Sequence, residues 1–404
     1  MMQSKKNILF ISQYFYPETF RGNDIAFHLA QQGHDVHVVC GIPNYPKGKF
    51  YEGYGLFKRQ NEAINGVEVT RLPVIPRGNN KIMLMLNYFS YFMVAWFWVL
   101  FHSITHKYDL VFCQQLSPVM MSAPAILYKR LKKVPLYTWI LDIWPESLTA
   151  AGGIKNKYIL SFFDWFVKRE YKFSDKILMS SNSFRKRILK YGDYEEKLIY
   201  FPQWADGDSF NSLITNELPD LPNGFIIMFA GAIGEAHNME SNMKAASLTK
   251  EYENIHWVYV GDGRKLEWVR KFVRDKSLES TVHTLGRFSS DMMPLFFEKA
   301  DVMLVSLKDS PLFNLYAPAK ISSYMASGRP IIAALNGEGA DVVKNAGCGW
   351  CINAGDAEAL ADLVISLSKL EKSELQEIGL SGLKYYNQHF NKELSLNKLD
   401  EIIK

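Results

Sequence analysis

The sequence has little cysteine and no apolar leader, and these two absences narrow the choice of compartment. Its 404 residues include four cysteines, Cys40, Cys113, Cys348 and Cys351, too few for a disulfide framework. Cys40 and Cys113 each end a strand-like apolar run, so we expect buried thiols there. The single Cys348-x-x-Cys351 pair has no second pair and no nearby histidine, which argues against zinc. The polar start, 1–6, indicates no signal peptide, and the cytoplasm is the expected compartment.

The chain also lacks a strong net charge and any internal repeat. A formal charge of +4 is too small to indicate a nucleic-acid partner, and 48% hydrophobic with 22% charged residues is typical of globular proteins. A chain of 404 residues is too long for one ordinary core, so two domains are expected. Basic clusters at 129–133 and 185–190 suit either an anionic membrane surface or a solvated helix face.

From Ile82 to His106 the sequence has no acidic or basic residue other than histidine, and by length it could cross a bilayer. Strand-like runs lie on both sides of it, however, and a spanning helix would separate parts of one sheet. We therefore expect 82–104 to form a helix that packs on the sheet and dips an aromatic face into a membrane interface. The rings expected at that level are Tyr88, Tyr91, Trp96 and Trp98.

Apolar runs of strand length alternate with helical periods, which is typical of βαβ units and parallel sheets. The linker candidate is 202–223, which is rich in Pro, Gly and Asp. We predict an α/β protein with two Rossmann-like domains, 1–205 and 206–387, that face each other across a cleft. Ligands bind at the carboxyl ends of such sheets. A C-terminal helix of about 388–404 is expected to pack back on the first domain.

Three segments of the second domain place small or basic residues where a strand ends and a helix follows. The turn 229–234 contains Gly231, Ile233 and Gly234 and leads to His237, and a second turn contains Gly261. Small residues let the backbone approach a phosphate, and helix N-termini favour anions. In 318–330, Pro318 starts a helix and Lys320 lies in its first turn. Since a cation there opposes the helix dipole, an anionic ligand would relieve the conflict; a solvent-exposed lysine is the alternative.

In the first domain, two loops lie at the predicted carboxyl edge of the sheet. Asp142, Trp144 and Glu146 belong to a stretch, 141–147, that directly follows the strand 136–140, and they form a candidate acceptor or donor site. A helix cap is the alternative for Asp142, and the functional role is favoured. The loop 17–24, after the first strand, offers Arg21, Gly22 and Asn23 to the cleft.

Together these motifs resemble glycosyltransferase family 4, whose members have the GT-B fold. The stretch Asp142-Ile143-Trp144-Pro145-Glu146-Ser147 is similar to a motif of an O-antigen, colanic acid and capsule subgroup that includes fucosaminyltransferase-like enzymes. The resemblance covers nearly the whole chain. Gly231–His237 resembles the diphosphate loop of that subgroup, 318–330 its nucleotide helix, and Gly337-Glu338 the loop after it.

The resemblance implies transfer of a sugar, with retention, from a UDP-sugar to a saccharide on a polyprenyl diphosphate. The sugar could be an N-acetylated deoxy sugar. The family needs no metal or other cofactor, and it implies peripheral attachment to the inner face of the cytoplasmic membrane during capsule, O-antigen, lipopolysaccharide or exopolysaccharide synthesis. The expected catalytic residues are Asp142, Glu146 and Lys320, and the expected acceptor residues are Arg21 and Trp144. The expected donor residues are Gly22, Asn23, Gly231, Ile233, Gly234, His237, Gly261, Arg287, Pro318, Lys320, Gly337 and Glu338.

The chain departs from the family pattern at two places. Leu315 and Ser323 stand where the general family has paired glutamates, and Leu141 stands where it often has histidine. The missing glutamates leave open a catalytically silent assembly protein of the same pathway. A UDP-N-acetylglucosamine 2-epimerase shares the two-domain architecture, but it has no lipid acceptor to reach.

Overall fold

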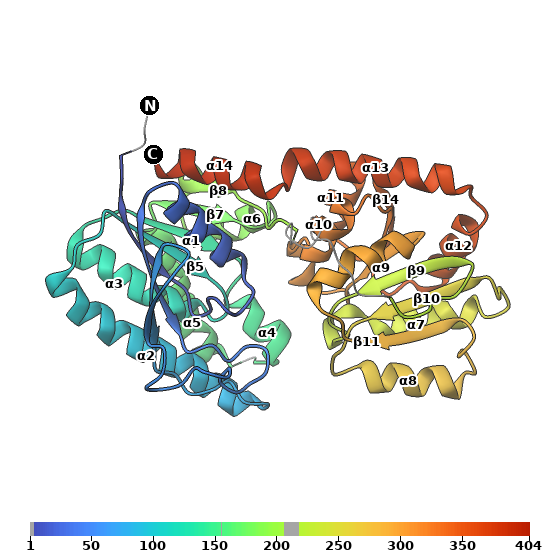
Figure 1. Cartoon of the computed structure of the whole chain (residues 1–404), viewed down its shortest axis with the longest axis horizontal. Coiled ribbons are helices and arrows are strands. Elements are labelled where there is room, and N and C mark those ends of the chain that lie inside the picture. Colours follow the sequence, from blue (N-terminus) through green and yellow to red (C-terminus); the bar gives the residue numbers. More distant parts are fainter. Residues whose placement is uncertain (1–3, 155, 206–217) are drawn as a thin grey trace. The chain divides into compact units, whose positions relative to one another are not determined.

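A computed structural model describes residues 4–154, 156–205 and 218–404. The chain forms two compact units, one of Met1–Pro202 with Leu396–Lys404 and one of Gln203–Ser395 (Figure 1). The boundaries expected from the sequence were 205 and about 388. Most of the predicted linker, 206–217, lies outside the described residues.

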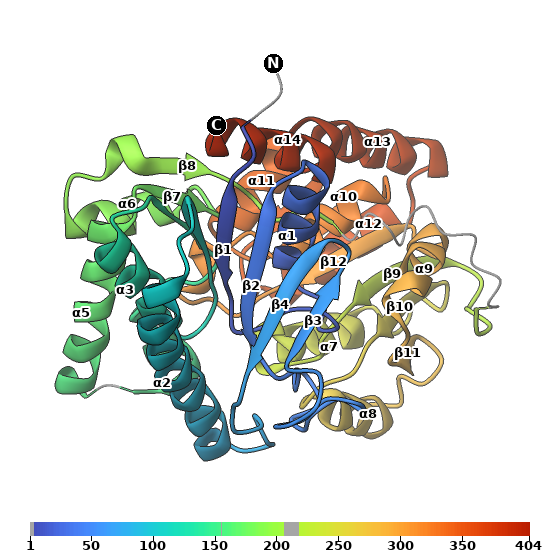
Figure 2. The same ribbon diagram turned by 60° about the vertical axis from the view of Figure 1, so that its left-hand side comes forward.

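Unit 1 contains an eight-stranded sheet in the order β3-β4-β2-β1-β5-β6-β7-β8, which is parallel except for the β3–β4 pair (Figure 2). Its strands are β1 (Asn7–Ile11), β2 (Asp35–Gly41), β3 (Asn61–Ile64), β4 (Val67–Leu72), β5 (Leu110–Gln115), β6 (Leu136–Ile140), β7 (Lys176–Met179) and β8 (Leu198–Tyr200). The edge strand β3 was not predicted. It has no fully buried residue, so it carries no apolar run that would mark it in the sequence.

The helices of unit 1 fill the connections between these strands, except for the last one, which comes from the end of the chain. They are α1 (Arg21–Gln31), α2 (Lys81–Thr105), η1 (Val119–Ser122), α3 (Ala123–Lys132), α4 (Glu146–Gly152), α5 (Lys157–Phe173), α6 (Phe184–Ile188), η2 (Leu189–Tyr191), η3 (Glu195–Lys197) and α14 (Lys392–Ile403). The start expected for the first helix, Asp24, was wrong. Phe20 is the extended N-cap, so the residues expected in a loop form the first turn of α1.

Helix α2 packs on the sheet through one narrow stripe. Its buried residues recur every fourth position, at Asn87, Tyr91, Ala95, Val99 and Ser103. Three of them join a core with residues of β1, β2 and β5. Because a stripe with this spacing runs along the whole helix, α2 lies on the sheet, as predicted, although it is long and apolar enough to cross a membrane by length and composition alone.

The aromatic face expected on α2 was partly wrong. Tyr91 is fully buried, and its hydroxyl donates to the Val39 carbonyl, so this ring lies against the sheet. Trp98 is half-buried and stacks on His102, with ring centroids 4.0 Å apart. The sequence could not set the phase of the helix because its apolar residues occur on every side.

Unit 2 contains a six-stranded parallel sheet in the order β11-β10-β9-β12-β13-β14. Its strands are β9 (Phe225–Ala230), β10 (Ile255–Val260), β11 (Val282–Gly286), β12 (Val302–Ser306), β13 (Ile331–Ala334) and β14 (Gly349–Ile352). Its helices are η5 (Glu235–His237), α7 (Met239–Leu248), α8 (Leu266–Asp275), η6 (Ser290–Met292), α9 (Met293–Lys299), η7 (Phe313–Leu315), α10 (Ala319–Ala326), α11 (Glu338–Ala346), α12 (Ala357–Leu367) and α13 (Lys372–His389). The alternation predicted after residue 224 is confirmed.

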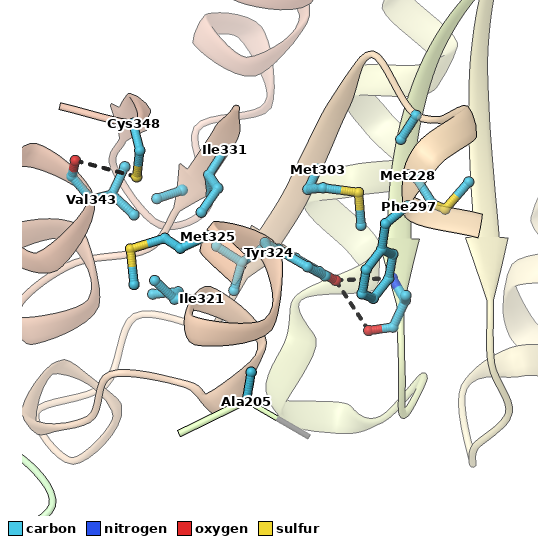
Figure 3. Packing of buried hydrophobic residues seen from close by; sticks show 14 of the residues in the cluster. Ala205, Met228, Phe297, Met303, Ile321, Tyr324, Met325, Ile331, Val343 and Cys348 are labelled. Atoms are coloured by element: carbon cyan, nitrogen blue, oxygen red, sulfur yellow. Dashed lines mark hydrogen bonds between the residues drawn. The ribbon is translucent and has the colours of Figure 1, made fainter. Parts of the chain in front are cut away.

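Helix α10 is held on this sheet by an apolar face and one polar anchor. Figure 3 shows Ile321, Tyr324 and Met325 of α10 among the sheet residues Met228, Met303 and Ile331. The Ala230 N–H donates to the Tyr324 hydroxyl at 3.0 Å, and this hydroxyl donates to the Ala230 carbonyl at 3.1 Å (Figure 3). The anchor therefore fixes α10 at the carboxyl end of β9.

Each sheet has one point at which the chain reverses its direction of strand addition. In unit 1 this point lies between β1 and β5, and in unit 2 between β9 and β12. Loops diverge there at the carboxyl ends of the strands, and open α/β sheets bind ligands in that crevice. A ligand-binding site is therefore expected at these two points.

Most of the last helix, α14, belongs to unit 1, from Leu396 onward. Leu399 and Ile403 are buried, and Lys176 Nζ donates to the Ile402 carbonyl at 2.6 Å. His28 on α1 and Asp400 on α14 form a side-chain contact of 2.9 Å. These contacts tie the end of the chain to its first half.

Candidate functional site

Two glycine turns pack backbone against backbone at the carboxyl edge of the unit 2 sheet. Gly231 follows β9 with a φ of +120°, and Gly261 follows β10 with a φ of +150°. A methyl group on residue 261 would lie 1.9 Å from the Gly231 carbonyl oxygen. Both positions therefore favour glycine because of the backbone conformation, and Gly261 also because of the close approach.

The backbone of the first turn is largely used within the protein. The Gly231 N–H donates to the Val260 carbonyl at 2.8 Å, and the N–H of the buried Ile233 donates to the Asp262 carbonyl at 2.9 Å. These two amides hold the turns together. Gly234 is different, since only His237 comes as close as 4.0 Å to a methyl group built there.

Lys320 enters this turn from the first turn of α10, after the N-cap residue Pro318. Its amine is buried and has no hydrogen-bond partner among the residues that the structure describes. It lies 3.5 Å from the centroid of the Phe229 ring and 3.0 Å from a methyl group built on Gly231. Burial lowers the pKa of Lys320 well below its usual range. The alternative of a solvent-exposed lysine is therefore wrong.

An unpaired ammonium at such a place is costly. A buried cation without a counter-ion loses its hydration, and a single ring face returns only part of that loss. An anion over the Gly231 turn would supply the missing partner, and the start of α10 would add a favourable dipole. Phosphate-binding sites in proteins commonly combine these features, a helix start, a cation and a closely approaching backbone.

His237 lies beside the same ring. Its centroid is 5.5 Å from that of Phe229, and its Nδ1 is 3.4 Å from the Ser306 carbonyl oxygen at the end of β12. Burial, together with the charge of Lys320, lowers the pKa of His237 to about 4, so the ring is neutral at pH 7. A neutral ring that donates from Nδ1 has an acceptor at Nε2.

The Gly337-Glu338 turn converges on the start of α10. Gly337 has a φ of +74°, and a methyl group there would lie 2.1 Å from the Asn314 carbonyl oxygen. Glu338 is buried at the start of α11. In the next position, a methyl group on Gly339 would lie 3.1 Å from Pro318 Cδ, so the helices α10 and α11 begin side by side.

Other donor candidates are placed less closely. Arg287 is exposed in the residue after β11, at the far edge of the sheet from β12. Of the two residues that stand in place of the paired glutamates, Ser323 donates within its own helix to the Ala319 carbonyl at 3.3 Å, and Leu315 lies in η7. The structure thus brings together Gly231, His237 and Lys320.

In unit 1 the structure assigns the Asp142 motif a local structural role. Ser117, Ser147 and the Trp144 indole all donate to the Asp142 carboxylate. Trp144 is buried and packs on Phe163, with centroids 5.0 Å apart. Trp144 is therefore a poor candidate for stacking on an acceptor, in contrast to the expectation. The sequence signal that was missed is Ser147, which lies five residues after Asp142 and whose hydroxyl donates to the Asp142 carboxylate.

Glu146 begins α4, three residues after Ile143, and pairs with Arg187 at 3.4 Å. Gly22 and Asn23 are buried in α1. A methyl group on Gly22 would overlap Gln114 Oε1 at 2.0 Å, and Asn23 Nδ2 donates to the Glu18 carbonyl at 2.7 Å. The side-chain positions of both residues are therefore directed at neighbouring residues of unit 1. Arg21 is half-buried at the start of α1.

Sequence reasoning missed Arg77 at this edge and did not single out Glu18, which lies in the loop 17–24 expected there. Arg77 donates to the Tyr14 hydroxyl at 3.1 Å, and its guanidinium lies 5.1 Å from the Tyr45 ring centroid. Glu18 accepts from the Asn44 and Tyr45 N–H groups at 2.7 and 2.6 Å. Burial raises the pKa of Glu18 to about 7 despite these bonds. The proline-rich run before Arg77, at the end of β4, was the available signal.

No group of three or more His, Cys, Asp or Glu side chains that could hold a metal occurs among the described residues. All four cysteines are unpaired thiols, with Cys40, Cys113 and Cys348 buried. Burial raises the pKa of Cys348 to about 12, as expected for an inert thiol.

Comparison with known proteins shows that each half of the chain matches a glycosyltransferase family model. Residues 23–206 match the model of Glycosyltransferase Family 4, and residues 224–369 match the model of Glycosyl transferases group 1. The chain is 25% identical over 313 residues to the colanic acid biosynthesis glycosyl transferase WcaI of Escherichia coli (strain K12), which is 74% of this chain and 75% of WcaI.

Solved structures share the fold over nearly the whole length. HepE of Anabaena, crystallised in complex with UDP, matches with a TM-score of 0.71 and 14% identity, covering 98% of this chain and 99% of HepE. WaaG, a glycosyltransferase of lipopolysaccharide biosynthesis, matches with a TM-score of 0.66 and 16% identity, covering 98% and 99%.

Proposed function

This chain is a glycosyltransferase of the GT-B fold, and we propose that it moves a sugar from a UDP-sugar to a saccharide carried on a polyprenyl diphosphate. Its relative WcaI is named for colanic acid synthesis, and the structurally similar WaaG for lipopolysaccharide synthesis. The proposed reaction is therefore a step in the synthesis of a bacterial surface polysaccharide. The choice of UDP is supported by HepE, whose structures hold UDP and UDP-glucose.

One observation carries the proposal: the buried, unpartnered Lys320 amine beside the Gly231 turn. A diphosphate placed there receives a full positive charge at the start of α10 and a backbone that approaches closely. The same contacts act on the leaving group. As the bond between the sugar and the diphosphate breaks, negative charge grows on the phosphate, and a preorganised cation stabilises it more in the transition state than in the ground state.

His237 is assigned a different role in this scheme. With Nδ1 donating to Ser306, its neutral Nε2 accepts, which suits a sugar hydroxyl better than a phosphate oxygen. The proposed donor sugar therefore lies on the His237 side of Lys320. The transfer is proposed to retain the configuration of the sugar, as the family resemblance implies.

The acceptor is proposed to use unit 1. Arg77, surrounded by the Tyr14, Tyr45 and Tyr88 rings, offers a cation for an anionic carrier at the carboxyl end of β4. Asp142 acts as a positioning residue, because its carboxylate organises the turn of Ser117, Trp144 and Ser147. Because the proposed acceptor is lipid-linked, the enzyme is proposed to act at the inner face of the cytoplasmic membrane.

The test is release of nucleoside diphosphate from UDP-, GDP- and dTDP-sugars, with and without lipid extract. We expect release from UDP-sugars that depends on extract. Lys320→Met removes the charge and keeps the chain length, and it should lower kcat/KM by about a hundredfold or more, the loss typical for one preorganised electrostatic contact.

The matched control is Lys344→Met on the exposed side of α11, which should leave kcat/KM unchanged. Circular dichroism of both variants checks folding. Full activity of folded Lys320→Met, or release from GDP-sugars alone, would contradict the proposed site or the proposed nucleotide respectively.

A further inference from the structure

We infer that Glu18 is a positioning residue for the acceptor. Its buried carboxylate joins the loops that follow β1 and β2, and through them it fixes the rings that surround Arg77 at the carboxyl edge of the unit 1 sheet. The inference rests on the proposed function, in which Arg77 meets the anionic carrier of the acceptor. Glu18 itself is too deeply buried to touch that carrier.

The group of side chains around Arg77 is an aromatic box formed by the rings of Tyr14, Phe20, Tyr45 and Tyr88. Tyr14 stacks on Phe20 with ring centroids 5.0 Å apart, and the Phe20 and Tyr45 centroids are 5.4 Å apart. The Arg77 guanidinium lies 5.1 Å from the Tyr45 centroid and 5.8 Å from that of Tyr88. Arg77 and Tyr45 are partly exposed, so the box can be reached from solvent.

The aromatic box is assembled from separate segments of the chain. Tyr14 follows β1, Tyr45 follows β2 and Arg77 follows β4, whereas Phe20 is the N-cap of α1 and Tyr88 lies on α2. The strands β1, β2 and β4 are neighbours in the sheet (Figure 2), but their paired residues end before the three loop residues. Contacts between the loops must therefore set their relative positions.

Glu18 supplies the contact between the first two loops. Its Oε1 accepts from the Asn44 and Tyr45 N–H groups at 2.7 and 2.6 Å. Its carbonyl accepts from Asn23 Nδ2 at 2.7 Å, which ties the same loop to α1. Two N–H groups on one carboxylate oxygen fix the backbone of Tyr45 relative to the loop that carries Tyr14.

Asn44 extends this connection to the loop that carries Arg77. Its Oδ1 accepts from the Arg77 N–H at 3.0 Å. The Gly78 N–H donates to the Gly48 carbonyl at 2.8 Å, which is a second bond between the same two loops. Glu18 therefore acts on Arg77 through Asn44.

The burial of Glu18 favours a role in positioning over one in stability. The residue is 1% exposed, and its Oε2 has no hydrogen-bond partner among the residues that the structure describes. A buried carboxyl with an unpartnered oxygen loses hydration, and apolar residues of similar size often give equal stability at such places. Proteins tolerate local costs of this kind chiefly at functional sites, and this one lies at the edge of the sheet where ligands bind.

The experiment measures binding of farnesyl diphosphate, a short polyprenyl diphosphate, by calorimetry. The full chain carries Lys320→Met throughout, so that the anion site of unit 2 does not contribute. Arg77→Met should weaken binding by about tenfold or more, since it removes a charge-assisted contact. Glu18→Ala should weaken it by about tenfold or more as well, because the released loops misplace the cation.

The matched variant is Glu18→Gln, whose amide oxygen can accept both N–H groups in place of Oε1, and it should bind nearly as well as the parent. Glu52→Ala removes an exposed carboxylate of unit 1 and should change nothing. Adding Glu18→Ala to Arg77→Met should cause little further loss, because the two residues act on one contact. Denaturant unfolding identifies a variant that fails to fold; Glu18→Asp, which keeps the charge on a shorter side chain, then replaces Glu18→Ala.

Turnover by chains with Lys320 intact separates positioning from general destabilisation. Glu18→Ala should raise the amount of lipid extract needed for half the maximal rate and leave the KM of the UDP-sugar unchanged. A loss of folded protein would lower the rate at every concentration without this split.

The inference would be overturned by unchanged binding in folded Glu18→Ala, by equal losses in Glu18→Gln and Glu18→Ala, or by losses that add to that of Arg77→Met. Normal binding by Arg77→Met would contradict the proposed acceptor site and the inference with it. Weaker binding by Arg77→Met together with normal binding by Glu18→Ala would contradict the inference alone.

Discussion

The Lys320 amine shows how one residue links burial to ligand binding. In the free protein, burial lowers its pKa well below the usual range, so the folded chain opposes the charge that a diphosphate requires. A bound anion favours the charged form and raises that pKa again. Between the two pKa values, the amine takes up a proton when the ligand binds.

We therefore expect UDP binding to be accompanied by proton uptake and to weaken as pH rises. Both effects follow because the ammonium that the ligand prefers is progressively lost in the free protein. Calorimetry at pH 8, in buffers of different ionisation enthalpy, measures the uptake where a phosphate with a pKa of about 6 is already ionised. In Lys320→Met the uptake should vanish. Equal uptake in that variant would show that another group titrates.

The sequence alone identified Lys320 as a candidate ligand-binding residue but did not show that its amine is buried and unpartnered. The first-turn position of Lys320 suggested an anion site, but its burial depends on Phe229 and the Gly231 turn, some ninety residues earlier, and only the fold brings them together. Asp142 shows the opposite case. It looked like a catalytic carboxylate, and three local donors make it the centre of a turn.

Among the elements, α2 depends on a polar anchor inside an apolar stripe. We expect Asn87→Ala to lower the free energy of unfolding by about 1–3 kcal/mol, because Gln13 and the Ile75 carbonyl lose their buried partner. Denaturant unfolding measures the change. The matched control Ser90→Ala, also on α2, removes a half-buried hydroxyl and should cost less. Equal losses would mean that the Asn87 bonds contribute little.

Helix α2 also shows what hydrophobic periodicity can and cannot predict. Its existence and bounds were predicted closely, because a long apolar segment between two strands has few other solutions. Its orientation was not, since Tyr91 and Trp98 could not be told from Phe89 and Phe101 in a segment that is apolar all round. The start of α1 was missed for a related reason, as Gly22 and Asn23 have low helix propensity. Gln114 lies where a larger side chain at residue 22 would project, and Asn23 is anchored by the Glu18 carbonyl.

For the molecule as a whole, the path of the chain determines which strands a substitution in the last helix affects. The chain leaves unit 1 at Pro202 and re-enters it at Leu396, so the last helix supports strands that lie near the beginning of the sequence. Lys6 Nζ donates to the Ile403 carbonyl, and Lys176 Nζ to the Ile402 carbonyl. Substitutions in α14 should therefore act on β1 and β7 of unit 1.

Hydrogen exchange read by mass spectrometry tests this path. Leu399→Ala empties a fully buried site, which costs about 2–5 kcal/mol, and should speed amide exchange in β1 and β7. The matched control is Leu394→Ala, an exposed position of the same helix that should have little effect. UDP should instead slow exchange in unit 2, around 229–238 and in α10, if Lys320 binds the diphosphate. Faster exchange in Leu399→Ala confined to unit 2 would contradict the assignment of α14 to unit 1, because the lost side chain would then support the other sheet.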